Sequence, residues 1–211
     1  MESTPYTFDS FVISERSRLA VATALDVVRN PKRAPNPLFL CGPTGSGKSH
    51  LLHAIEHALR SRHPRASILR ISAQALIDLL IAAIRSDEVR AWRQSLAELD
   101  ALLVDDFRFG AHQQYTQEAI LVTLEELVSS GVQIVAASDA GPANRALMVQ
   151  VGYPDADARV QIARNAALRH GVALSDNALR SLSKRIAGSP RRLQSAIVRM
   201  AAEAILSGPL A

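Results

Sequence analysis

The segment GPTGSGKS, residues 42–49, has the spacing of a phosphate-binding loop. It matches the pattern G-x-x-x-x-G-K-[ST], and it lies between an apolar strand-like run and a helical pattern, the context that the motif needs. In such a loop the glycines let successive backbone N–H groups face the phosphates, the lysine neutralises phosphate charge, and the serine hydroxyl can ligate Mg²⁺. A flexible turn with a chance lysine, the alternative, does not account for that context. The expected nucleotide-binding residues of this segment are Gly42, Pro43, Thr44, Gly45, Ser46, Gly47, Lys48, Ser49 and His50.

A second chemical pattern is the run ALLVDD, residues 101–106, which has the character of a buried strand that ends in two acids. Ligands of open α/β sheets bind at the carboxyl ends of the strands. Asp105 and Asp106 would therefore sit where a Mg²⁺ ligand and a water-activating base are needed beside bound phosphates. Two acids that merely end a strand at the surface are the alternative, and the phosphate loop favours the functional interpretation.

Polar residues also follow the next strand-like run, QIVAAS at 133–138. Ser138 and Asp139 stand at its end, where a polar side chain would lie beside the γ-phosphate and orient water. A simple turn residue after a strand explains Asp139 equally well from these residues alone.

Three histidines, His50, His53 and His57, fall on one face of the helix that follows the phosphate loop. A zinc site would need further ligands, but no cysteine is close in sequence and Glu56 is the sole nearby acid. We expect partly exposed helix-face histidines here. Cys41, at the end of a buried strand, is expected to be a small core residue.

The composition describes a globular protein with an aliphatic core. Of its 211 residues, 48% are hydrophobic and only 4% are aromatic. One cysteine cannot form an internal disulfide, and no signal peptide is visible at the N-terminus, so we expect a cytoplasmic protein. The most apolar run, ALIDLLIAAI, contains Asp78 and is too short to span a bilayer. The net charge of +4 suits a nucleotide or nucleic-acid partner, although an arginine-rich composition bias would produce it equally well.

Strand-like and helical patterns alternate along the first part of the chain. Strands are expected at 38–41, 67–71, 101–106, 133–138 and 146–151, and helices at 14–30, 50–62, 73–85, 88–96 and 116–130. Ser72 is the expected N-cap of the helix at 73–85. Helical patterns alone follow, at 155–171, 175–188 and 189–206. The pattern predicts an α/β core with a mostly parallel sheet at residues 1–152 and a small helical domain at 153–211.

These motifs together resemble the AAA+ module of the bacterial replication initiator DnaA family. The segments that carry the resemblance are YTFDSFVIS (6–14), NPLFLCGPTGSGKSHLLHAI (36–55), IRSDEVRAWRQSLAELDALLVDD (84–106), YTQEAI (115–120), QIVAASD (133–139) and AGSPRRLQSAIVRM (187–200). The resemblance implies a P-loop NTPase of AAA+ type, with a parallel five-stranded sheet and a three-helix lid. It also implies ATP or ADP with Mg²⁺ as cofactors.

The resemblance assigns roles to particular residues. It implies an adenine pocket around Phe11, Val12 and Ile13, and it pairs Ser49 and Asp105 with Mg²⁺. By the same resemblance, the expected catalytic residues are Asp106 for water activation, Asp139 as the first sensor and Arg191 as the sensor arginine of the lid. The resemblance also implies that the pair of helices from Ala73 to Leu96 would correspond to the insertion by which initiators engage single-stranded DNA.

The chain also departs from the family pattern. Between the first sensor and the last core strand, the family carries an arginine finger in the pattern D-R-L-x-S-R-F, whereas this chain has only AGPANRALMVQV, with Arg145 as its one arginine. A finger supplied in trans accelerates hydrolysis by several orders of magnitude. We therefore expect slow intrinsic ATP hydrolysis and self-assembly that is weak or depends on a partner.

Three further departures bear on partners. The chain ends at Ala211, where an initiator would continue into a duplex-reading helix-turn-helix domain, so we expect no sequence-specific binding of duplex DNA. Tyr115 stands where initiators commonly carry a basic residue near single-stranded DNA, and a tyrosine can stack on a base but cannot neutralise a phosphate. The N-terminus lacks the glutamine-led motif with which regulatory paralogues bind the sliding clamp.

Two function hypotheses follow. The first is an ATP/ADP-binding switch that acts in the initiation of DNA replication or its regulation, and the second is an interaction protein that docks on the initiator or the helicase. A small-molecule kinase is disfavoured because the C-terminal segment resembles an AAA+ lid. Arg85, Arg90 and Arg93 near Trp92 suit either single-stranded DNA or a solvated helix face.

Overall fold

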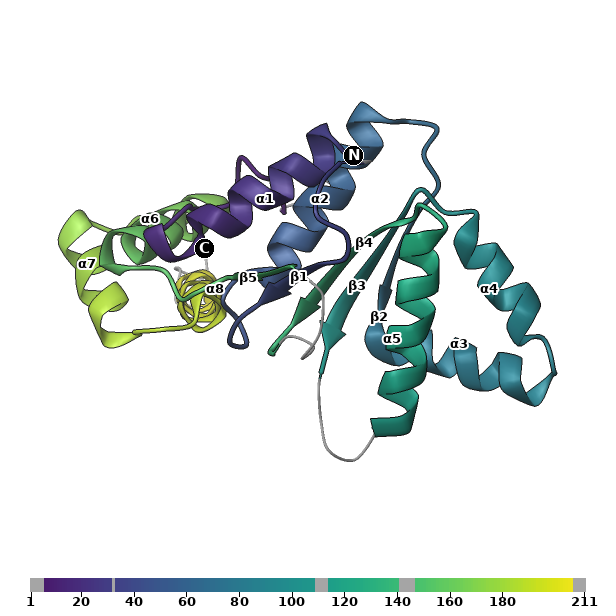
Figure 1. Cartoon of the computed structure of the whole chain (residues 1–211). Coiled ribbons are helices and arrows are strands. Elements are labelled where there is room, and N and C mark those ends of the chain that lie inside the picture. Colours follow the sequence, from purple (N-terminus) through teal and green to yellow (C-terminus); the bar gives the residue numbers. More distant parts are fainter. Residues whose placement is uncertain (1–5, 32, 109–113, 141–146, 207–211) are drawn as a thin grey trace. The chain divides into compact units, whose positions relative to one another are not determined.

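The computed structural model describes residues 6–31, 33–108, 114–140 and 147–206 (Figure 1). A parallel sheet forms the centre of the first unit, with strand order β2-β3-β4-β1-β5. The strands are β1 (Leu38–Cys41), β2 (Ile68–Ser72), β3 (Ala101–Phe107), β4 (Gln133–Ser138) and β5 (Leu147–Gln150). The predicted five-stranded parallel sheet is therefore confirmed, and β1 and β4 have the expected bounds.

Helices cover both faces of this sheet (Figure 1). Those of the first unit are α1 (Arg18–Arg29), α2 (Lys48–Arg62), α3 (Ala73–Arg85), α4 (Val89–Ala97) and α5 (Gln114–Ser129), and the short 3-10 helix η1 (Glu15–Ser17) precedes α1. Alternate residues of the central strands β1, β3 and β4 enter two separate cores because strand side chains point to opposite faces. Thus Leu38 and Leu40 pack with α1 and α2, while Phe39 and Cys41 pack with α3 and α5.

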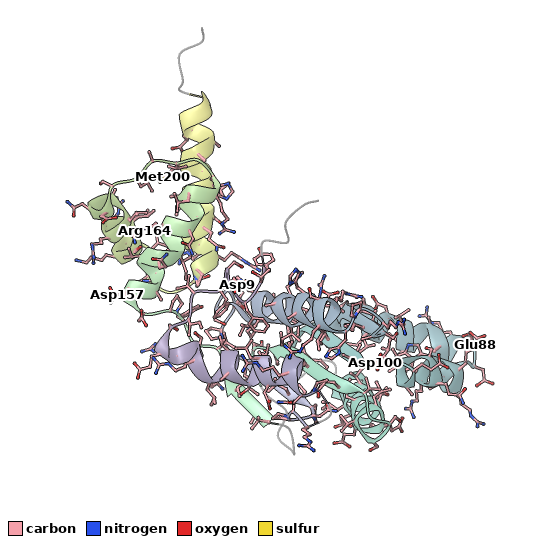
Figure 2. All side chains as sticks on the ribbon, turned by 90° about the horizontal axis from the view of Figure 1, so that it is seen from above. Asp9, Glu88, Asp100, Asp157, Arg164 and Met200 are labelled. Carbon is pink, nitrogen blue, oxygen red and sulfur yellow. The ribbon has the colours of Figure 1, made fainter. Side chains whose placement is uncertain are left out.

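The helices α6 (Ala156–Arg169), α7 (Asp176–Arg185) and α8 (Pro190–Leu206) have their own alanine-rich core. Figure 2 shows the side chains of Asp157 and Arg164 on α6 and that of Met200 on α8. Serine and aspartate N-caps begin two of these helices: Asp155 accepts from the Ala158 N–H, and Ser175 accepts from the Ala178 N–H. The polar caps explain why the helices begin where the sequence predicts.

Contacts within the chain fall into two compact units. The first comprises Met1–Phe11, Leu19–Gly42 and Lys48–Val151, and the second comprises Val12–Arg18, Pro43–Gly47 and Gly152–Ala211. The second unit therefore groups the tip of the phosphate loop with α6, α7 and α8. In the described part of the chain, no helix is both long enough and apolar enough to cross a membrane.

Candidate nucleotide site

The phosphate loop joins β1 to α2, as the motif requires. Gly45 and Gly47 have φ values of +79° and +115°, in a region that side-chain-bearing residues rarely adopt. Lys48 is the first residue of α2, so the free N–H groups and positive dipole end of a 15-residue helix face the loop. The loop also contains a buried Ser46 hydroxyl that has no hydrogen-bond partner among the described residues. Positive φ values at glycines and a helix N-terminus are features that anion-binding loops share.

Lys48 lies among the acids that the sequence singled out. Its ammonium group donates a hydrogen bond to the Gly42 carbonyl oxygen over 2.6 Å. Burial lowers the pKa of Lys48, and this outweighs the opposite effect of the nearby Asp139, Asp105 and Asp106 carboxylates. The structure therefore brings all three predicted acids into the electrostatic neighbourhood of the loop lysine.

The Ser49 hydroxyl and the Asp105 carboxylate fit the Mg²⁺ site that the sequence predicts. Ser49 Oγ donates a hydrogen bond to Asp105 Oδ1 over 3.0 Å, although the two residues are 56 positions apart. Two adjacent oxygen ligands at a phosphate site match the way proteins hold Mg²⁺, which keeps several waters and uses substrate phosphates as further ligands. Ser49 and Asp105 would hold the ion, which would neutralise charge on the phosphates.

The side chain of Asp106 does not follow that of Asp105 toward Ser49, because β3 contains a bulge at this point. The pairing of β3 with β4 shifts between Val104 and Phe107, and Asp106 takes φ +54°. Its N–H donates to Asp105 Oδ1 over 2.8 Å, and its side chain is 68% exposed. A bulge of this kind re-aims a side chain near a functional site. The two adjacent acids therefore face different surroundings.

Arg108 holds the Asp106 carboxylate in a two-point ion pair, which sequence analysis missed. Arg108 Nε lies 3.1 Å from Asp106 Oδ1, and Nη2 lies 3.2 Å from Oδ2. The hydrogen bond and charge of Asp106 raise the pKa of Arg108, with a smaller contribution from Asp139. The signal in the sequence was an arginine two residues after Asp106, the predicted water-activating residue.

Asp139 follows β4 at the same edge of the sheet as Asp105. Its Oδ1 accepts a hydrogen bond from the Ala140 N–H over 2.9 Å, an arrangement typical of a turn residue. Just before it, Ser138 is fully buried, and its backbone carbonyl oxygen accepts a hydrogen bond from the Gly42 N–H over 3.1 Å. The strand β4 therefore positions Asp139 and also ties down the start of the phosphate loop.

The N-terminal segment packs on the first turns of α2 through His50. The ring centroid of His50 lies 5.0 Å from that of Phe11 and 5.0 Å from that of Tyr6. His50 Nε2 also lies 2.9 Å from the Thr7 carbonyl oxygen and 3.2 Å from Ser10 Oγ. Phe11 and His50, both predicted as nucleotide-binding, are thus brought together, while the anchoring role of Tyr6 and Thr7 was missed because it depends on packing.

The other histidines of α2 have separate surroundings. Burial, followed by the nearby Arg70, lowers the pKa of His53, and its ring lies 5.4 Å from that of Tyr6. His57 is exposed. Within the described residues, no group of three or more His, Cys, Asp or Glu side chains is arranged to hold a metal ion. Burial also raises the pKa of the Cys41 thiol, as expected for a core cysteine.

Within the second unit, the tip of the phosphate loop lies against residues of the segment from Gly152 onward. The Tyr153 hydroxyl donates a hydrogen bond to the Thr44 carbonyl oxygen over 3.1 Å. A Cβ atom at Gly45 would collide with the Ser189 hydroxyl and would lie 3.5 Å from the Arg191 Cβ. The Cβ atom of Arg191, the predicted sensor arginine, therefore lies beside the loop tip.

Residues Val12 and Ile13 belong to the same unit as this tip. Ile13 is 54% exposed, and Val12 is half-buried. Within the same unit, the Gly152 N–H donates a hydrogen bond to the Arg16 carbonyl oxygen over 3.2 Å, which links the segment at 12–18 to the segment that leads into α6. An adenine pocket lined by Val12 and Ile13 remains a prediction.

The arginines around Trp92 do not share one environment. Arg93 forms an ion pair with Glu126 on α5 at 2.9 Å, whereas Arg85 and Arg90 are exposed. Trp92 packs against the core between the sheet and α3–α5. Two other predictions cannot be placed: Arg145 lies outside the described residues, and so does the side chain of Tyr115.

Comparison with known proteins shows similarity in sequence over most of the chain. The family model for the bacterial DnaA ATPase domain matches residues 3–150. The chromosomal replication initiator protein DnaA of Synechococcus sp. is 34% identical over 216 aligned residues, which cover 96% of this chain and 46% of that protein. The chain spans about half the length of the curated relatives it matches.

Solved structures show the same fold. Domain III of the Thermotoga maritima replication initiation protein DnaA superposes with a TM-score of 0.88 at 27% identity, over 98% of this chain and 91% of that one. A replication initiator DnaA bound to AMPPCP and single-stranded DNA superposes with a TM-score of 0.81 at 22% identity, over 98% of this chain and 66% of that one. The AAA+ architecture that the family resemblance implied is thereby confirmed.

Proposed function

Because this chain belongs to the family of bacterial DnaA ATPase domains, we propose that it is an ATP/ADP-binding switch in the initiation of DNA replication or its regulation. In this role the bound nucleotide sets the conformation of the protein, and the protein in turn sets the activity of a partner. The single buried cysteine supports action in the reducing cytoplasm.

The observation that carries the proposal is the hydrogen bond between Ser49 and Asp105 beside Lys48. It joins the phosphate loop to the end of β3 at 3.0 Å and assembles a lysine, a hydroxyl and a carboxylate at one helix N-terminus. These are the groups that bind nucleotide phosphates and Mg²⁺ in P-loop proteins. The solved relative bound to AMPPCP supports an adenine nucleotide as the ligand.

We assign the remaining roles by the geometry of their surroundings and by family membership. Asp106 activates the attacking water, Asp139 senses the γ-phosphate, and Arg191 acts as the sensor arginine. Phe11, held against His50, forms part of the adenine side together with Val12 and Ile13. Hydrolysis is slow in the isolated protein because the family's arginine-finger motif is missing from the sequence between Asp139 and Val151.

Nucleotide binding tests this proposal directly. Fluorescent ATP and ADP analogues are titrated into the unaltered protein and into Lys48→Ala, with Mg²⁺ present. We expect micromolar or tighter binding by the unaltered protein and an affinity at least about tenfold weaker for the variant, because one cation no longer meets the phosphates. Lys184→Ala removes an exposed lysine of α7 and serves as the matched control. Equal affinity in all three proteins would reject the site.

A second candidate function is that of an interaction protein that docks on the initiator or the helicase. The edge strand β5 favours it, since the Leu147 and Met148 side chains there are 45% and 48% exposed. Exposed apolar residues on an edge strand are suited to contact with another chain. When the protein is mixed with its cognate initiator, we expect a species heavier than either protein alone and a changed rate of ATP turnover. If neither the mass of the species in solution nor the rate of ATP turnover changes on mixing, docking on the initiator is rejected.

Single-stranded DNA is a further proposed partner, supported by the relative whose structure contains it. In this chain the support is limited to the exposed Arg85 and Arg90, because Arg93 is paired with Glu126. A fluorescent oligonucleotide titrated at several salt concentrations tests it. Real phosphate contacts require an affinity that falls steeply with salt.

A further inference from the structure

The ion pair between Arg108 and Asp106 lies at the point where the proposed hydrolysis needs a base. Both carboxylate oxygens of Asp106 are engaged, Oδ1 by Nε at 3.1 Å and Oδ2 by Nη2 at 3.2 Å. Two parallel N–H···O bonds of this kind give an arginine–carboxylate pair a fixed geometry. The carboxylate that would accept a proton from water is thus already bound by a permanent cation.

We propose that Arg108 restrains ATP hydrolysis by holding Asp106 away from the attacking water. This inference rests on the proposed nucleotide site and adds a cause of slow turnover within the chain itself. It is separate from the missing arginine-finger motif, which concerns a cation supplied by a neighbouring molecule.

The chemistry of hydrolysis explains why such a pair slows the reaction. The water oxygen forms a bond to the γ-phosphorus, the bond from that phosphorus to the ADP oxygen breaks, and the proton of the water passes to a carboxylate. The proton must reach a lone pair on one of the carboxylate oxygens, and in this structure both oxygens of Asp106 accept hydrogen bonds from Arg108. Asp106 must leave Arg108, or share it, before it can take that proton.

The local backbone supports a separate role for each of the two acids. Asp105 turns toward Ser49, whereas the bulge places Asp106 at φ +54° with 68% of its side chain exposed. Asp105 contacts Ser49 of the phosphate loop, whereas Asp106 contacts Arg108. Nucleotide binding and hydrolysis therefore depend on different side chains. A change at Arg108 should therefore alter the rate of hydrolysis and leave nucleotide affinity intact.

Arg108 is also a clean position for substitution. Its side chain is 68% exposed, so its replacement does not open a cavity or strand a buried charge. Arg108→Gln keeps hydrogen-bonding groups and removes the charge. Arg164→Gln is the matched control, because Arg164 forms an exposed ion pair with Asp176 at 2.7 Å between α6 and α7.

The experiment measures single-turnover ATP hydrolysis with Mg²⁺ present and with the protein in excess over ATP and above its dissociation constant, together with ATP affinity, for each variant. We expect Arg108→Gln to hydrolyse ATP about two- to fivefold faster than the unaltered protein, in line with the modest strength of exposed ion pairs. Its ATP affinity should be unchanged, and Arg164→Gln should match the unaltered protein. In the background of Asp106→Asn, Arg108→Gln should give no acceleration, since no base remains to be released.

Two results would overturn the inference. One is an Arg108→Gln rate equal to or below that of the unaltered protein with ATP affinity retained, which leaves the nucleotide site standing. The other is an acceleration that persists in the Asp106→Asn background, which would place the effect of Arg108 elsewhere. Absence of ATP binding by the unaltered protein is a distinct result that overturns the proposed function, and the inference with it.

Discussion

Ser189 lies so close to Gly45 that a single added methyl group at the glycine would collide with the serine hydroxyl. Ser189 directly precedes α8, and Gly45 is the second glycine of the phosphate loop. The same loop tip accepts a hydrogen bond at the Thr44 carbonyl from Tyr153, at the start of the helical unit. The tip of the candidate phosphate loop is therefore in direct contact with the residue that precedes α8, the helix that carries Arg191.

Substitution of Gly45 by alanine should disturb this connection. The backbone there has φ +79°, which costs an alanine about 1–2 kcal/mol, and the methyl group also meets Ser189. We expect a lower melting temperature and weaker ATP binding in Gly45→Ala. Adding Ser189→Gly should recover the steric part of the loss and not the part due to φ. Thermal unfolding and nucleotide titration of the single and double variants measure both parts, and full stability of Gly45→Ala would contradict the packing described.

The ion pairs of Glu56 with Arg60 and Arg70 should make the free energy of unfolding decrease at acid pH. Burial alone would raise the pKa of Glu56, but hydrogen bonds and charges from Arg70 and Arg60 outweigh it and lower that pKa. A depressed folded-state pKa means that the stabilisation is present above the unfolded pKa, about 4.3, and is lost as pH falls through the folded value. At pH 7, Glu56→Gln should lose about 1–3 kcal/mol of unfolding free energy.

Chemical denaturation at several pH values checks this prediction. The stability difference between Glu56→Gln and the unaltered protein should shrink as pH falls below about 4, because the unaltered protein then loses the same charge. Glu125→Gln, at an exposed position of α5, should show little difference at any pH. A constant difference between Glu56→Gln and the unaltered protein across the range would mean that the charge of Glu56 contributes nothing.

His50 should hold the N-terminal segment in place. Its replacement by alanine removes the hydrogen-bonding contact with the Thr7 carbonyl and the ring contacts with Tyr6 and Phe11. We expect faster amide hydrogen exchange in residues 6–11 and an ATP affinity about tenfold weaker, since the lost contacts together are worth roughly 1–2 kcal/mol. His57→Ala, at the exposed His57 of the same helix, is the control. Unchanged exchange in residues 6–11 would show that His50 is not their anchor.

The pair formed by Ser49 and Asp105 should determine how Mg²⁺ affects nucleotide binding. Ser49→Ala removes one oxygen of the pair and Asp105→Asn removes its negative charge, which Mg²⁺ prefers in its ligands. We expect both variants to bind ATP with an affinity that responds less to Mg²⁺ than that of the unaltered protein. Titration with and without EDTA provides the measurement. An undiminished response in both variants would move the ion to other ligands.

The sequence alone was sufficient to predict most of the helices and strands of this protein and the place of the glycine-rich loop between β1 and α2. Local signals carry that information: the N-cap at Ser72, the glycines of the loop, and apolar runs such as residues 38–41, which form strands with the expected bounds. Local chemistry also predicted that the acids after β3 and β4 would meet near Lys48, because parallel strands end at one edge of a sheet.

Only the tertiary structure decided how those residues are divided among partners. The bulge in β3 directs Asp105 to Ser49 and leaves Asp106 to Arg108, and no local pattern announces a bulge within an apolar strand that ends in two acids. The contact of His50 with Thr7 and that of Ser189 with Gly45 join segments 43 and 144 residues apart. Such contacts arise from the packing of whole helices against strands and loops, and a single sequence does not contain their distances.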